Sequence, residues 1–169
     1  FSLQLNQSIS TEFENFQDTI LLVDENQKDV SSSAGHSLMD NHPFSVDRYM
    51  IANKNTSALK IILEKGNLFA FCELVEKEAM MLHSLMMTSS PSYVLMKPET
   101  LEIIDEIKSF RNINKVPVCF TLDAGANVHV LYPEKYSKSV LGFINSKLSK
   151  YCFQGKFIID HIGKGPEKI

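Results

Sequence analysis

The sequence predicts an α+β fold in which helices pack against a mostly antiparallel four-stranded sheet. Short runs rich in β-branched and aromatic residues are bounded by Asp, Gly, Asn and Ser, which is typical of strands that end in turns. Longer segments repeat apolar residues at spacings of three and four, which is typical of amphipathic helices. The predicted order is strand, three helices, two strands, helix and strand. Because strands and helices do not alternate strictly, this order disfavours a doubly wound parallel sheet.

The first two predicted helices are adjacent in the chain. Ser45–Lys65 is expected to begin with Ser45 as its N-cap and to end before Gly66. Its apolar positions are Val46, Tyr49, Met50, Leu59, Ile62 and Leu63. Asn67 is expected to cap the second helix, where apolar residues form one continuous face of Leu68, Phe71, Val75, Ala79, Leu82 and Met86. We expect the neighbouring methionines Met80, Met81 and Met87 to belong to the core as well.

The other elements surround a short polar break in the second half of the chain. A third helix is predicted from Pro98, a residue favoured in the first turn, to Arg111 near its end. A fourth helix is predicted from Glu134 to Tyr151. The four strands are predicted at Thr19–Asp24, Val116–Leu122, Val128–Tyr132 and 156–163.

Length, charge and hydropathy favour a soluble protein. A chain of 169 residues with 44% hydrophobic side chains is of the size of one compact domain, and we expect residues 1–169 to form one. The net charge is -3 and the basic residues are dispersed, which argues against nucleic-acid binding through a basic stripe. No apolar run approaches the roughly 20 residues that span a bilayer, and the first residues do not resemble a secretory signal. We therefore expect no membrane partner and a cytoplasmic location.

Cysteines, histidines and nucleotide motifs restrict the chemistry further. Cys72, Cys119 and Cys152 are far apart and have apolar neighbours, so we interpret them as buried reduced thiols. The five histidines are not at metal-ligand spacings, and we expect no metal ligand among them. Neither a GxGxxG motif after a strand nor a GxxxxGK[ST] motif occurs. If the whole protein binds ATP, the nucleotide site lies elsewhere.

Two polar segments are candidates for a functional site. "VSSSAGH", residues 30–36, follows a predicted strand, and its hydroxyl and N–H groups can hold phosphate oxygens or simply form a Ser/Gly turn. Asp123 stands in "LDAGAN", at the junction of two strands. A carboxylate there can take a proton from a substrate hydroxyl, but Asp, Gly and Asn are also ordinary turn residues. From the residues alone, both interpretations stay open at both places.

The segments "KDVSSSAGH", "EAMMLHSLMMTSSPSYVLM" and above all "FTLDAGANVHVLYP" resemble the C-terminal half of the diphosphomevalonate decarboxylases, members of the GHMP kinase superfamily. The resemblance covers about residues 19–165. It implies a GHMP-type C-terminal lobe whose partner N-terminal lobe carries the ATP-binding loop. It also implies ATP and Mg²⁺ as cofactors, bound mainly by that other lobe, and mevalonate 5-diphosphate as substrate. The 169-residue chain would then be inactive alone.

The resemblance also assigns roles to individual residues. Asp123 matches the family's catalytic aspartate, and Ala124 and Gly125 accompany it in the substrate site. Ser32 matches the serine that contacts the substrate, with Ser33 beside it. The acid at the strand junction would thus meet the tertiary hydroxyl of the substrate.

Two departures from the family pattern keep the substrate open. Ala126 stands where many relatives have proline, which would loosen the turn, and His36 stands where many have methionine. A related kinase or decarboxylase that acts on mevalonate or its monophosphate is therefore an alternative. A ligand-binding or dimerisation module without catalysis is a third, and a homodimer stays open.

Overall fold

The computed structural model describes residues 9–25 and 42–163. Its centre is a four-stranded sheet in the order β2-β3-β1-β4 with every neighbouring pair antiparallel. The strands are β1 (Phe16–Leu21), β2 (Cys119–Leu122), β3 (Val128–Pro133) and β4 (Phe157–His161). The predicted α+β class and the order of the elements are confirmed. The boundaries differ, because β1 lies three residues earlier than predicted and β2 begins only at Cys119.

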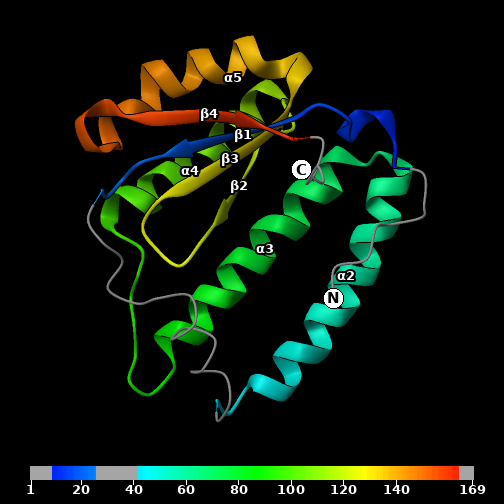
Figure 1. The fold of residues 1–169 in the computed structure, drawn as a ribbon, viewed down its shortest axis with the longest axis vertical. Helices are drawn as coiled ribbons and strands as arrows, with labels where there is room; N and C mark the ends of the chain where they lie inside the picture. The colour runs from blue at the N-terminus through cyan, green and yellow to red at the C-terminus, as the bar shows by residue number, and fades with distance from the viewer. Residues whose placement is uncertain (1–8, 26–41, 164–169) are drawn as a thin grey trace, which may run out of the picture.

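The helices are α2 (Ser45–Lys65), α3 (Leu68–Met87), α4 (Pro98–Asn114) and α5 (Ser137–Phe143). Figure 1 shows α5 above the sheet and α2 and α3 as a long antiparallel pair below it. Within the described residues, no helix is long and apolar enough to cross a bilayer. The three cysteines are buried and free, as predicted.

The helix predicted from Glu134 to Tyr151 is interrupted. A 3₁₀ turn (Glu134–Tyr136) precedes α5, and a π-helical turn (Ile144–Leu148) and a second 3₁₀ turn (Ser149–Tyr151) follow it. Polar side chains bond back to the backbone here, since Ser146 donates to the Gly142 carbonyl and Ser149 to the Asn145 carbonyl, both at 2.8 Å. Such bonds compete with the regular helical pattern, and the apolar periodicity does not register them.

The main core lies between the sheet and the layer formed by α4 and α5. On β3, Val128, Val130 and Tyr132 have no exposed surface and alternate with half-buried residues. Opposite them lie Ile103, Ile104 and Ile107 of α4 and Val140 and Phe143 of α5. The rings of Phe110 and Phe143 stack at 4.1 Å and join the two helices.

The sequence predictions about the ends of α2 and α3 and about the apolar face of α2 have different outcomes. Gly66 ends the helix with a left-handed φ of 70°, and Asn67 caps α3 by accepting a hydrogen bond from the Ala70 amide at 3.1 Å, so both end signals are confirmed. The N-cap prediction is wrong, because Phe44 precedes the first helical residue and makes no side-chain cap. Of the apolar residues assigned to α2, three are mostly exposed: Val46, Tyr49 and Met50.

The predicted apolar face of α3 is rotated from the face that is most buried. Of the predicted set only Ala79 and Met86 are buried, and Met87 is exposed. The buried stripe is Cys72, Glu76, Ala79, His83, Leu85 and Met86. Because α3 lies between the sheet and α2, residues on both sides of this stripe are partly covered as well. Two members of the buried stripe, Glu76 and His83, are polar.

Candidate functional site

Asp123 lies in the turn that connects β2 to β3, residues 123–127. The Asp123 carbonyl accepts a hydrogen bond from the Gly125 amide at 2.9 Å, which folds the chain back at once. Asp123, Ala124 and Gly125 are half-buried, and the Oδ1 atom of Asp123 is fully buried. The turn thus carries a carboxylate at the end of a strand, as the sequence predicts.

Helix α3 anchors the first residue of this turn. The Nε2 atom of His83 lies 3.1 Å from the carbonyl oxygen of Asp123. A carbonyl only accepts, so His83 donates through Nε2–H. Burial lowers the pKa of His83 below its usual value of 6.5, although the hydrogen bond and the nearby Asp123 carboxylate act in the opposite direction. The neutral ring with its proton on Nε2 is therefore the favoured form.

Helix α4 anchors the far side of the turn. The hydroxyl of Thr100, which has no exposed surface, donates to the carbonyl of Ala126 at 2.7 Å. The same hydroxyl accepts a hydrogen bond from the Lys97 amide at 3.1 Å and so also closes the N-terminus of α4. The turn that was expected to be loosened by Ala126 is held by this contact, and Ala126 itself is buried.

The segment after β1 provides a third anchor. The Asp24 amide donates to the Oδ1 atom of Asn127 at 3.0 Å. The carboxylate of Asp24 also forms an ion pair with Lys97 at 2.5 Å, which ties this segment to the start of α4. Contacts from three separate parts of the chain therefore hold residues 123–127 in place.

The remaining predicted site residues cannot be placed next to this turn. Ser32, Ser33 and His36 lie outside the described residues. His83 and Thr100 were not singled out as site residues by sequence reasoning. His83 continues the spacing of four and three residues that relates Cys72, Glu76 and Ala79. A polar residue on that buried stripe is the signal that could have identified it. Within the described residues, no three His, Cys, Asp or Glu side chains are close enough to hold a metal ion.

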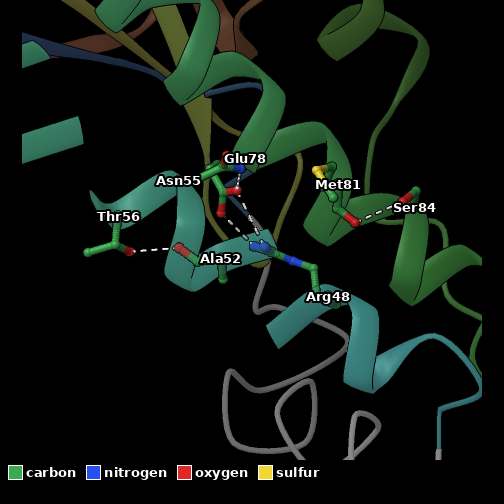
Figure 2. Close-up of polar contacts among 7 residues, drawn as sticks. All are labelled: Arg48, Ala52, Asn55, Thr56, Glu78, Met81 and Ser84. Carbon is green, nitrogen blue, oxygen red and sulfur yellow. Dashed lines mark hydrogen bonds and ion pairs between the residues drawn. The ribbon is translucent and has the colours of Figure 1, made fainter. Parts of the chain in front are cut away.

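A second polar cluster lies between α2 and α3. Arg48 of α2 forms two hydrogen bonds with the carboxylate of Glu78 on α3, at 2.7 and 3.4 Å, and Asn55 donates to the same carboxylate. Figure 2 shows the two α2 side chains converging on Glu78. Burial alone would raise the pKa of Glu78, but the contacts with Asn55 and Arg48 outweigh it and lower the pKa below its usual value of 4.5. These contacts join α2 to α3.

Comparison with known proteins covers nearly the whole chain. A family model of the mevalonate 5-diphosphate decarboxylase C-terminal domain matches residues 19–168. A phosphomevalonate decarboxylase of Haloferax volcanii is 28% identical over 97 residues, which are 57% of this chain and 30% of that protein.

Solved structures show the same fold. The mevalonate pyrophosphate decarboxylase of Streptococcus pyogenes superposes with a TM-score of 0.81 at 21% identity, over 96% of this chain and 49% of that one. A structure named MDDEF in complex with MVAPP, AMPPCP and magnesium superposes with a TM-score of 0.74 at 21% identity, over 86% of this chain and 44% of that one. The present chain thus spans about half the length of these solved relatives.

Proposed function

This chain belongs to the mevalonate 5-diphosphate decarboxylase C-terminal domain family, and from that premise we propose that it is one lobe of an ATP-dependent decarboxylase. The proposed reaction converts mevalonate 5-diphosphate to isopentenyl diphosphate and releases ADP, phosphate and CO2. The observation that supports it best is the turn 123–127, which carries the acid and is held by contacts from α3, from α4 and from the segment after β1.

In this proposal Asp123 acts on the tertiary hydroxyl of the substrate. Its carboxylate accepts the hydroxyl hydrogen and orients the oxygen, which takes the γ-phosphoryl group of ATP. Departure of phosphate then leaves positive character at that carbon. The electrons of the bond to the carboxylate move in to form the double bond, and CO2 leaves. Ala124 and Gly125, with small or no side chains, let the substrate approach the carboxylate closely.

ATP and Mg²⁺ fit the other half of such an enzyme better than this one. The described residues hold no cluster of carboxylates that would bind a metal ion, so we derive no step through Mg²⁺ here. Phosphoryl transfer depends mainly on positioned cations around the phosphates. We therefore expect the 169-residue chain to be inactive without a second lobe. The proposed location of the whole enzyme is the cytoplasm.

One observation favours a second candidate substrate. The relative from Haloferax volcanii, 28% identical over 57% of this chain, is named a phosphomevalonate decarboxylase. A monophosphate would have the same tertiary hydroxyl and the same need for an acid at position 123. The chemistry at Asp123 would be unchanged, and the binding of the phosphate end would differ. Ser32 and Ser33 are the proposed contacts at that end.

The test is Asp123→Asn in the full-length protein that contains this chain. We expect kcat to fall at least about a hundredfold, because the amide keeps the shape but loses the charge and the basicity. ADP and CO2 release would be measured with mevalonate 5-diphosphate and with the 5-phosphate, alongside a melting curve. Asp105→Asn, on the exposed side of α4, is the matched control and should keep full activity. Near-normal turnover of Asp123→Asn would reduce Asp123 to a turn residue.

A further inference from the structure

We propose that His83 is a positioning residue for Asp123, which holds the backbone of the acid so that its carboxylate meets the substrate in one orientation. The inference rests on the proposed function and adds a residue from α3 to it. The observation behind it is the contact of 3.1 Å between His83 Nε2 and the carbonyl oxygen of Asp123. His83 is 1% exposed, so this contact is formed away from bulk water.

The contact acts on the backbone atoms from which the carboxylate side chain branches. The carbonyl of Asp123 accepts two hydrogen bonds, from His83 and from the Gly125 amide. A carbonyl oxygen has two lone pairs, and when both are used the peptide plane that follows Asp123 is fixed. The Cα atom of Asp123 belongs to that rigid plane, so the point from which the side chain branches is held in place as well.

Histidine suits this role because it donates without adding charge. The neutral ring donates to the carbonyl of Asp123, whereas an apolar side chain would leave that acceptor with one partner fewer. A lysine or arginine at the same place would put a positive charge beside the carboxylate and compete with the substrate for it. The lowered pKa of His83, caused first by its burial, agrees with a neutral donor at this position.

The three anchors of the turn are not equivalent. Thr100 and Asp24 contact the far end of the turn, at Ala126 and Asn127. His83 contacts Asp123 itself. A loss of the His83 contact should therefore move the carboxylate, while the path of the chain into β3 stays in place. This expectation separates a positioning role from a general contribution to stability.

The first arm of the test is kinetic and uses the full-length protein. His83→Leu removes the donor, and we expect kcat to fall roughly ten- to a hundredfold with KM changed by less than about threefold, as for a misplaced catalytic group. His83→Gln restores a neutral donor and should recover most of kcat. Thr19→Val is the matched control, since it deletes another buried hydrogen bond, the 2.7 Å contact between the Thr19 and Tyr132 hydroxyls, in the strand between β3 and β4. That variant should lose stability and keep kcat.

The second arm needs no turnover. Imidazole nitrogen shifts in the NMR spectrum should show His83 protonated at Nε2, and His83→Leu should move the amide signals of Ala124 and Gly125 far more than that of Asn127. If His83→Leu fails to fold, His83→Asn, whose shorter amide cannot span the same distance, replaces it. A kcat for His83→Leu no lower than that for Thr19→Val, or unshifted Ala124 and Gly125 signals, would overturn the proposal. Failure of the wild-type protein to decarboxylate either substrate would instead reject the proposed function, and the NMR arm would still decide the role of His83.

Discussion

Helix α3 carries two Glu–Arg pairs that differ in their surroundings. Glu76 and Arg111 of α4 are joined by contacts of 2.5 and 2.9 Å, and their side chains are 8% and 12% exposed. Glu78, two residues further along, is 31% exposed and pairs with Arg48 of α2. A separation of two residues places the two glutamates on nearly opposite sides of the helix. A Glu–Arg pair thus occurs once on the side of α3 that faces the sheet, with an arginine from α4, and once on the side that faces α2.

The depth of each pair decides what it contributes. Arg111 also donates to the Val118 carbonyl at 2.8 Å, just before β2, so the inner pair connects α3, α4 and the sheet. Hydrogen bonding to Glu76 raises the pKa of Arg111 and keeps it charged. A buried pair gains little net energy from its formation, but the loss of one partner strands a charge in the interior. A half-exposed pair lets water replace the lost partner. The inner pair should therefore be far more sensitive to mutation than the outer one.

The largest effect is expected from Arg111→Ala. It leaves the carboxylate of Glu76 buried without its cation, and we expect a loss of about 3–5 kcal/mol in the free energy of unfolding. Chemical denaturation monitored by circular dichroism measures it. The double variant Glu76→Leu with Arg111→Met removes both charges and should recover most of the loss, since apolar pairs of similar volume replace buried ion pairs well. A loss below 1 kcal/mol for Arg111→Ala would mean that water reaches the inner pair.

A neutral contact in the same interior separates the effect of burial from that of charge. Thr100→Val keeps the shape of the side chain but removes the hydroxyl from Ala126 and from the Lys97 amide. We expect a cost of about 1–3 kcal/mol, because a buried acceptor loses its donor. Thr100→Ser retains the hydroxyl and serves as the control in the same denaturation experiment. An unchanged stability of Thr100→Val would show that these two hydrogen bonds contribute little to the free energy of unfolding.

The outer pair should tolerate the same kind of change. Arg48→Ala leaves Glu78 with its Asn55 contact and with access to water, so we expect a loss of at most about 1 kcal/mol. The comparison with Arg111→Ala in one buffer is the direct test of the role of depth. A loss of equal size at both sites would show that α2 shields its pair as completely as the sheet shields the inner one.

The smallest expected effect is a difference between the two sides of α3 in how the free energy of unfolding depends on pH. The folded pKa of His83 lies below 6.5, so the unfolded chain binds a proton first and stability falls as pH drops below 6.5. The folded pKa of Glu78 lies below 4.5, so its stability is present above 4.5 and is lost as pH falls through the folded value. Unfolding free energies measured from pH 8 to pH 3 should show both windows. His83→Gln should remove the first, and Glu78→Gln the second; a first window that persists in His83→Gln would belong to another group.

Sequence reasoning succeeded where the signal is local and periodic. The Gly66 stop, the Asn67 cap and the Pro98 start depend on backbone conformations that neighbouring residues control, and all three appear in the structure. It failed where the apolar periodicity does not carry the signal. The interrupted α5 depends on serine side chains that turn back on the backbone. At the start of α2, the spacing assigned Val46, Tyr49 and Met50 to an apolar face, and all three are mostly exposed.

The sequence by itself determined the class of the fold, the order of its elements and the acid at the β2–β3 junction. These follow from periodicity, from turn chemistry and from a motif read in order, all of which are contained in short stretches of chain. Only the tertiary structure decided which side of α3 faces inward, because a buried Glu76 or His83 is acceptable only when Arg111 or the Asp123 carbonyl lies opposite. Those partners are 35 and 40 residues away along the chain, and the balance between desolvation and pairing exists only once they have met.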